Sequence, residues 1–193
     1  MKKFKLTSEF IVDISGVKLF RIKALIEFGN VKDGDLGGYI EKEENLSHMG
    51  NAWVSGNAQV SGDARVSGNA RVSGDARVFG NAWVFGDARV SGNARVSGDA
   101  QVFGDARVSG NAQVFGDARV SGDKDYAYAH GFGSCNRTTT FFRLKDGDVG
   151  VRCGCFYGTL AQFRDNVCET HGETKKAQEY LMLADLMDFR FKN

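Results

Sequence analysis

Proline is absent from this chain of 193 residues, and no apolar stretch is long enough to cross a membrane. A spanning helix needs about 20 consecutive apolar residues, so we expect no membrane segment. Proline lacks the N–H group that a β-ladder uses, so its absence favours strands paired on both sides. The basic segment 1–10 lacks the apolar run of a signal peptide, and we expect a cytoplasmic protein with reduced cysteines.

An excess of either charge is also missing. Lysine and arginine total 25, and aspartate and glutamate total 24. This balance disfavours a basic nucleic-acid-binding protein and an acidic nucleic-acid mimic. Arg71, Arg89 and Arg107 could follow phosphates along a repeat, but Asp87 and Asp105 would repel them. We therefore expect no direct binding of nucleic acid.

The chain contains instead a six-residue motif that repeats with constant spacing over residues 50–122. It reads Gly, Asn or Asp, Ala, any residue, Val, then Ser or Phe. A disordered glycine-rich linker would not keep its aliphatic residue in phase, so the repeat predicts a stacked architecture. The valines are Val54, Val60, Val66, Val72, Val78, Val84, Val90, Val96, Val102, Val108, Val114 and Val120.

Each hexad combines a short strand with a corner. Alternation puts alanine and valine on the inner face of the strand and the residues after each on the outer face. Glycine with Asn or Asp suits the corner, because these residues tolerate left-handed backbone. Three hexads would close a coil of roughly eighteen residues, with coils stacked about 4.8 Å apart.

This pattern resembles the left-handed parallel β-helix of the hexapeptide-repeat proteins. The family's aliphatic position matches each valine and its small-residue position matches each alanine. The stretch 32–47, with Asp35-Leu36-Gly37-Gly38-Tyr39-Ile40, resembles the lead-in of such proteins from bacteria and phages, some of them acyltransferases and others polymer-forming proteins. The resemblance implies an all-β solenoid, here of about five coils, and left-handedness.

We divide the chain into an N-terminal β-hairpin cap (1–33), the hexapeptide-repeat β-helix (34–122) and a small α+β C-terminal domain (123–193). In the cap we expect strands at 10–14 and 17–22, the second prolonged through 24–28. In the C-terminal domain we expect a ββαα order, packed on the last coil. Its elements are strands at 138–144 and 149–156, a helix capped by Thr159 and a helix at 173–189. The stretches 139–143 and 153–160 resemble C-terminal modules of phage-encoded β-helical proteins.

Outward aromatic residues mark the candidate binding site. With three hexads per coil, one face carries Arg65, Trp83, Gln101 and Arg119 beside Ser67, Phe85, Phe103 and Ser121. Serine holds the Phe85 and Phe103 position in most hexads, so the coil does not need phenylalanine there. Exposed aromatic residues with arginine at the rim are typical of an interface. The C-terminal domain, a second copy of the chain or a foreign partner could each cover this patch. The predicted binding residues are Trp83, Phe85, Phe103, Arg65 and Arg119. Two further outward aromatic residues, Phe79 and Phe115, lie on the next face.

Catalysis is the first alternative. Hexapeptide acyltransferases use a histidine as general base, near an inserted loop. None of the three histidines, His48, His130 and His171, lies in the regular coils, and the coils hold no inserted loop. His48, in the irregular first coil, is the one positional candidate, and a capping role suits it better. We predict no catalytic residue.

A zinc site is the second alternative. Cys153 and Cys155, with Cys168, His171 and Cys135, could form a tetrahedral set. Their spacing fits no standard zinc ribbon or finger. If 149–156 is one strand, Cys153 and Cys155 share a face and fill the core under the helices. We predict neither a metal nor another cofactor.

Together these observations predict a non-enzymatic binding protein. The phage-type resemblance implies an accessory protein of a phage or prophage, working in the cytoplasm of a bacterial host cell. Its partner would be a host protein or ribonucleoprotein, and inhibition of a defence system such as CRISPR is a task it could perform. A hexapeptide-type acyltransferase and a self-assembling structural protein are the alternatives. Surplus apolar residues on the helix at 173–189 (Met182, Leu183, Leu186) predict a homodimer.

Overall fold

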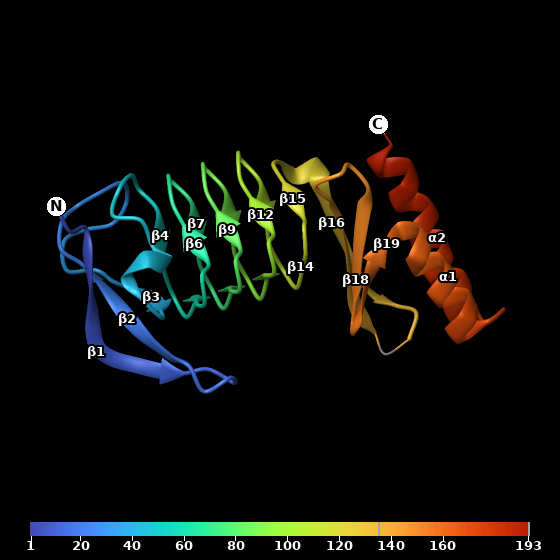
Figure 1. Cartoon of the computed structure of the whole chain (residues 1–193), viewed down its shortest axis with the longest axis horizontal. Coiled ribbons are helices and arrows are strands. Elements are labelled where there is room, and N and C mark those ends of the chain that lie inside the picture. Colours follow the sequence, from blue (N-terminus) through green and yellow to red (C-terminus); the bar gives the residue numbers. More distant parts are fainter. Residues whose placement is uncertain (135, 193) are drawn as a thin grey trace.

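The computed structural model describes residues 1–134 and 136–192 and shows a parallel β-solenoid of about five turns. An N-terminal hairpin lies at one end, and an antiparallel sheet with two helices lies at the other (Figure 1). The predicted all-β solenoid with a β cap and an α+β end is confirmed. Its twelve short strands are β4 (Trp53–Val54), β5 (Gln59–Val60), β6 (Arg65–Val66), β7 (Arg71–Val72), β8 (Arg77–Val78), β9 (Trp83–Val84), β10 (Arg89–Val90), β11 (Arg95–Val96), β12 (Gln101–Val102), β13 (Arg107–Val108), β14 (Gln113–Val114) and β15 (Arg119–Val120).

Three parallel sheets form the faces of the solenoid. The first face has the order β13-β10-β7-β4, the second contains β5-β8-β11-β14, and the third has the order β15-β12-β9-β6. Equivalent residues of successive coils pair in register, as Val90 does with Val72 and Val108. Every repeat valine and alanine is at most 1% exposed, so these two columns form the core, as predicted.

Glycines make the corners possible. The corner glycines from Gly50 to Gly116 have φ between 63° and 73°, a region that other residues rarely adopt. Space is the second constraint, because a Cβ added to Gly86 would lie 3.0 Å from the backbone nitrogen of Gly104 in the next coil. The neighbouring Asn and Asp side chains bond along the stack, as in Asn69 Nδ2 to Asp87 Oδ1 at 2.9 Å. The corners therefore add a side-chain ladder to the backbone ladder.

The N-terminal cap is the hairpin of β1 (Phe4–Val12) and β2 (Lys18–Ala24), and the irregular first coil that follows holds β3 (Leu36–Ile40) and the short 3-10 helix η1 (Glu43–Asn45). Together they join the second face in the order β1-β2-β3-β5. The predicted continuation of the second strand through 24–28 is wrong. The chain turns at Gly29, where φ is 54°, and Phe28 folds back to contact the Trp53 ring at 5.4 Å.

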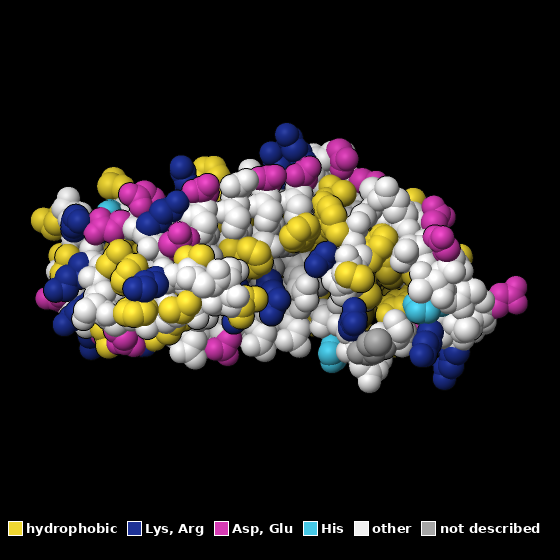
Figure 2. Space-filling model, turned by 60° about the horizontal axis from the view of Figure 1, so that its bottom comes forward, with side chains coloured by type: hydrophobic (Ala, Val, Ile, Leu, Met, Phe, Trp, Pro, Cys, Tyr) yellow, Lys and Arg dark blue, Asp and Glu magenta, His cyan; other side chains and the backbone are white. Residues whose placement is uncertain are grey.

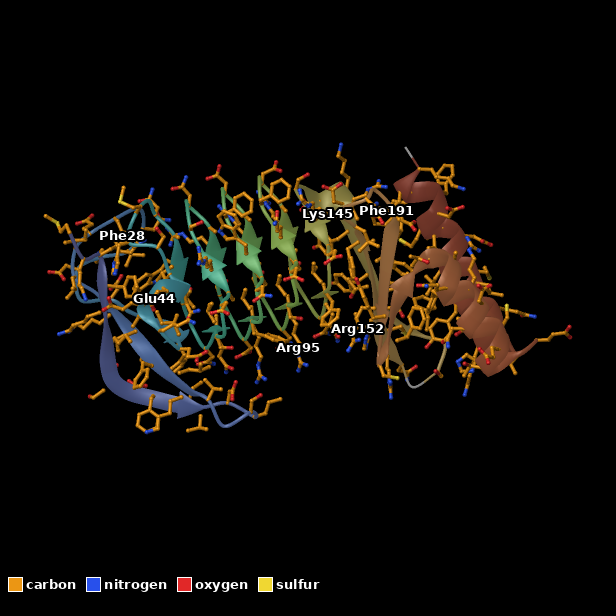
Figure 3. All side chains as sticks on the ribbon, viewed as in Figure 1. Phe28, Glu44, Arg95, Lys145, Arg152 and Phe191 are labelled. Atoms are coloured by element: carbon orange, nitrogen blue, oxygen red, sulfur yellow. The ribbon has the colours of Figure 1, made fainter. Side chains whose placement is uncertain are left out.

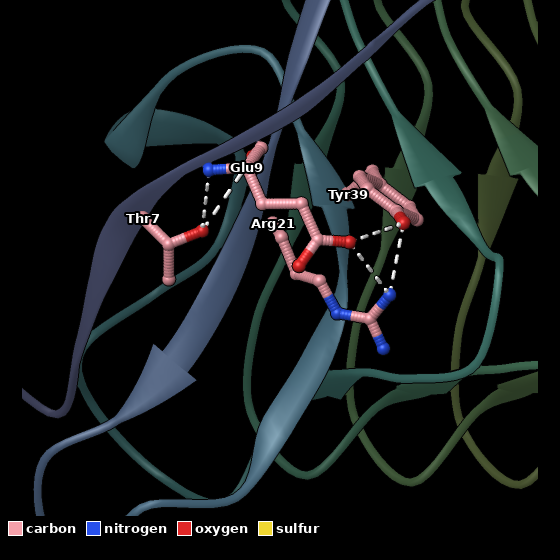
Figure 4. A network of polar contacts seen from close by, with 4 residues as sticks. All are labelled: Thr7, Glu9, Arg21 and Tyr39. Atoms are coloured by element: carbon pink, nitrogen blue, oxygen red, sulfur yellow. Dashed lines mark hydrogen bonds and ion pairs between the residues drawn. The ribbon is translucent and has the colours of Figure 1, made fainter.

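A polar network joins the two hairpin strands to β3 of the first coil (Figure 4). Arg21 Nη1 donates to the Tyr39 hydroxyl at 2.8 Å and to Glu9 Oε1 at 3.3 Å. The Tyr39 hydroxyl donates to the same carboxylate at 3.1 Å, and the Glu9 backbone N–H donates to Thr7 Oγ1. Because Glu9, Arg21 and Tyr39 belong to β1, β2 and β3, the network fixes the hairpin against the first coil.

The C-terminal part holds η2 (Asp123–Asp125) and a sheet in the order β16 (Tyr126–Phe132), β17 (Arg137–Arg143), β18 (Val149–Cys153), β19 (Phe156–Thr159). The helices α1 (Leu160–His171) and α2 (Lys175–Phe191) follow. The predicted ββαα order is wrong in two ways. Strand β16 was not predicted, and the expected strand at 149–156 is divided by a turn at Gly154, where φ is 61°. Thr159 caps α1 as predicted, accepting a bond from the Gln162 N–H.

The sheet closes the last coil. On β17, Phe142 enters the solenoid core with Tyr126 and Leu144, while Phe141 packs with the helices. Figure 3 labels Phe191 at the end of α2, where the Arg143 guanidinium donates to its carbonyl oxygen at 2.7 Å. The predicted packing of this part on the last coil is confirmed.

Candidate functional site

The aromatic residues of the third face form a continuous cluster, which we call the aromatic cluster: Trp83, Phe85 and Phe103. The Trp83 and Phe85 rings lie 4.4 Å apart, and those of Phe85 and Phe103 stack at 5.1 Å with an interplanar angle of 6°. Trp83 is 41% exposed, and both phenylalanines are half-buried. None of the three belongs to the buried core. The cluster is therefore an apolar surface on a rigid face.

The two predicted rim arginines lie in the column of Trp83. Arg65 pairs with Trp83 in the preceding coil, and Arg119 pairs with Gln101, which itself pairs with Trp83. Both arginine side chains are exposed. The structure thus brings all five predicted binding residues to one face.

A hollow of about 530 Å³ adjoins Trp83 at the N-terminal end of this face. The first irregular coil supplies Glu43, Glu44 and His48, and the repeat supplies Arg65 and Trp83. The Trp83 indole N–H donates to Ser67 Oγ at 3.1 Å, which fixes the ring over the preceding coil. A partner that covers the aromatic cluster would meet carboxylates at this end.

His48 lies at the edge of the hollow and is held by the cap. Its Nδ1 accepts the Lys3 backbone N–H at 3.2 Å, and its ring stacks on Phe4 at 4.3 Å. Its Nε2 is buried and lies 3.8 Å from Glu43 Oε2. A general base needs an accessible lone pair. Since Nδ1 is occupied by the Lys3 N–H and Nε2 is buried beside Glu43, this geometry favours a capping role.

The other two histidines lie outside the solenoid. His130 is exposed on β16, with Nδ1 3.0 Å from Thr138 Oγ1, and His171 stacks on Tyr180 at 5.8 Å. Neither is near the hollow beside Trp83.

The cysteines do not lie as predicted. Cys153 Sγ accepts from Thr139 Oγ1 at 3.2 Å, but Cys155 is exposed beyond the turn and Cys168 is exposed on α1. The expectation that Cys153 and Cys155 share one strand face in the core is wrong, because Gly154 reverses the chain between them. Cys135 lies outside the described residues. Within residues 1–134 and 136–192, no three His, Cys, Asp or Glu side chains are grouped to hold a metal ion.

The N-terminal end of the solenoid leaves backbone carbonyls without a preceding coil. In the ladder each N–H donates to the next coil, as from Arg89 to Ala106. The buried Lys3 ammonium donates to the carbonyl oxygens of Gly50 and Ala52, the latter at 2.8 Å. The Asn45 amide nitrogen Nδ2 likewise donates to the carbonyl oxygens of Gly62 and Ala64. Donor side chains therefore replace the missing coil.

The C-terminal end has the opposite problem, since its last N–H groups have no following coil. Side-chain oxygens accept from these N–H groups instead, all at 2.9–3.0 Å. The Arg107 N–H donates to Asp123 Oδ1, the Gln113 N–H to Thr140 Oγ1 and the Ser121 N–H to Asp125 Oδ2. We call these two sets of contacts the end seals. Apart from the loss of the repeat at both ends, no sequence pattern predicts these seals.

Comparison with known families supports the repeat architecture. A family model described as the YdcK β-solenoid repeat matches residues 58–74, 70–86, 88–102 and 100–114. All four segments lie within the regular coils, so the match concerns the solenoid. No curated protein sequence matches the chain significantly. Among the described helices, none combines the length and apolarity needed to cross a membrane.

Proposed function

We propose that the chain is a non-enzymatic binding protein that presents the aromatic cluster to a protein partner. The cluster is the observation that carries this proposal. Phenylalanine replaces the usual serine in two successive coils of one face, and the parallel register stacks the two rings. A β-helical face holds its side chains before a partner arrives, so little ordering entropy is lost on binding. Aromatic anchors with arginine at the rim suit an interface centre.

Acyl transfer has less support. The one histidine near the third face, His48, has its Nδ1 occupied by a backbone N–H and its Nε2 buried. Proton abstraction from a substrate would need this ring to leave its stack on Phe4.

Self-assembly into filaments also has less support. End-to-end stacking of solenoids would need open ladder edges, which template the pairing of another chain. In the end seals, side chains of the same chain bond the free carbonyl oxygens at one end and the free N–H groups at the other. A lateral contact is compatible with both seals.

For such a contact we propose a homodimer through α2. Its outer face exposes Met182 (71%) and Leu186 (55%), whereas Leu183, counted as surplus from the sequence, packs on the core of the C-terminal part. Two-fold pairing is the commonest closed assembly.

The finer part of the proposal is that the partner is a host protein or ribonucleoprotein of a bacterium, and that binding inhibits a defence system such as CRISPR. It rests on the phage-type resemblance of the lead-in and of the C-terminal stretches. Affinity capture from a bacterial lysate, with the parent chain and with Phe85→Ser/Phe103→Ser side by side, tests both parts. A partner held by the parent and lost by the variant supports the cluster, and its identity supports or removes the defence role.

A further inference from the structure

A second recess lies on a different face of the solenoid, between the tip of the N-terminal hairpin and the second face. It has a volume of about 360 Å³. Figure 2 looks toward this side and shows basic and apolar side chains between the hairpin on the left and the C-terminal sheet on the right. Its walls and floor include Asp13, Ile14, Glu41, Arg77, Phe79 and Arg95. We call it the hairpin groove.

The cations of the hairpin groove are not used by the fold. Arg77 and Arg95 pair in register on β8 and β11, so one stands above the other. Within the described parts of the chain, neither guanidinium has a carboxylate within 4.0 Å or a hydrogen-bond partner. A guanidinium binds a carboxylate well because its donors match the two oxygens.

The carboxylates of the groove, in contrast, are occupied. Asp13 Oδ1 accepts the backbone N–H groups of Ser15 and Val17 at 2.8 and 2.9 Å, which shapes the hairpin turn. Glu41 Oε2 accepts the N–H of Gly62 at 2.6 Å. The groove therefore offers free positive charge beside acidic groups that already serve the backbone.

Apolar side chains complete the groove. Phe79 is 38% exposed where most hexads carry serine, and Ile14 is 90% exposed at the hairpin tip. The face continues toward the C-terminal sheet, where the Arg152 guanidinium lies 5.0 Å from the Phe115 ring. In Figure 3, Arg95 and Arg152 lie on the same side of the molecule. Cationic and aromatic groups thus continue along this face.

We propose that the hairpin groove binds an acidic polypeptide segment that carries at least one large apolar side chain. Its carboxylates pair with Arg77 and Arg95, and its apolar side chain lies against Phe79 and Ile14. A nucleic acid fits less well, because its backbone carries a charge at every phosphate and would bring some of them against Asp13 and Glu41, whereas a peptide can place its carboxylates at Arg77 and Arg95 and neutral residues beside the two acidic groups. This site is separate from the aromatic cluster, so either can fail without the other.

The test uses fluorescence anisotropy at physiological ionic strength on the full chain. The probe is a labelled short peptide in which glutamate alternates with glycine, leucine and phenylalanine. We expect Arg77→Gln/Arg95→Gln to weaken binding by about tenfold or more, and Phe79→Ser to weaken it as well. Arg71→Gln/Arg89→Gln is the matched control, because these arginines pair one above the other on the first face. It should bind like the parent.

Two further probes complete the experiment. The same peptide with glutamine in place of glutamate should not bind, and an oligothymidine of equal length should bind more weakly than the acidic peptide. The variant Phe85→Ser/Phe103→Ser should keep full peptide binding. Equal losses in the two arginine pairs, absence of binding by the parent chain, or a preference for the oligothymidine would each overturn the proposal.

Discussion

The rings of Phe85 and Phe103 stack at 5.1 Å because the residues hold the same place in successive coils. Serine holds the place of Phe85 and Phe103 in most hexads, so this stack is not required for the coil. A side chain that the scaffold does not need is free to serve a partner.

The first prediction concerns the core. Val90 is fully buried between Val72 and Val108, so Val90→Asp places an unpaired charge in the stack. We expect a loss of about 3 kcal/mol or more in the free energy of unfolding. Ser91→Asp, one residue along on the outer side, should change it by less than about 0.5 kcal/mol. Urea unfolding followed by circular dichroism measures both, and equal losses would contradict the inner and outer assignment.

The second prediction concerns His48. Replacing it by alanine removes the stack on Phe4 and the acceptor for the Lys3 N–H. We expect His48→Ala to lose about 1 kcal/mol of stability and to bind the captured partner like the parent. Turnover of acyl-CoA by the parent chain, abolished in a folded His48→Ala variant, would establish the acyltransferase instead.

The third prediction concerns the N-terminal seal. Burial, with a smaller effect of Arg71, lowers the pKa of Lys3 from 10.5 to about 8. Between these values the unfolded chain holds a proton that the folded chain has released, so stability should rise with pH from about 8 to 10.5. The neutral amine still has hydrogens for Gly50 and Ala52.

The matching control is Lys3→Met, which cannot titrate. The difference in unfolding free energy between parent and variant, followed from pH 8 to 10.5, should grow in favour of the parent. A difference that stays constant over this range would show that Lys3 keeps its ordinary pKa and is not desolvated in the seal.

The fourth prediction concerns assembly. Because Tyr126, Phe142 and Leu144 complete the solenoid core, cutting off the C-terminal part would expose the last coil, and point changes are the cleaner test. We expect a dimer by light scattering, converted to a monomer by Met182→Lys/Leu186→Lys. Met49→Lys alters another highly exposed methionine, at the opposite end, and should leave the dimer intact. A monomeric parent chain would remove the proposal.

The repeated parts of the fold could be predicted from the sequence, whereas the parts that occur once, strand β16 and the end seals, could not. Val54 to Val120 fixed the coil and its columns, because an error in phase would put every valine outside. Strand β16 was missed because Ala127, Ala129 and Gly131 carry no strand signal, and β16 is held by pairing with β17. The end seals depend on single side chains such as Lys3 and Thr140, whose partners are distant in sequence. The aromatic cluster could be predicted, since the coil period alone places Trp83, Phe85 and Phe103 together.

The most direct test of the central claim is the affinity of Phe85→Ser/Phe103→Ser for the captured partner, measured by calorimetry. The melting temperature of the free variant is measured beside it, as a check on the fold. Serine is the repeat's usual residue, so the melting temperature should not change. Binding should weaken by about 2 kcal/mol or more. Phe132→Ser, which removes an exposed aromatic ring at the end of β16, should bind like the parent. A double variant that melts and binds like the parent would contradict the claim that the aromatic cluster is the working surface.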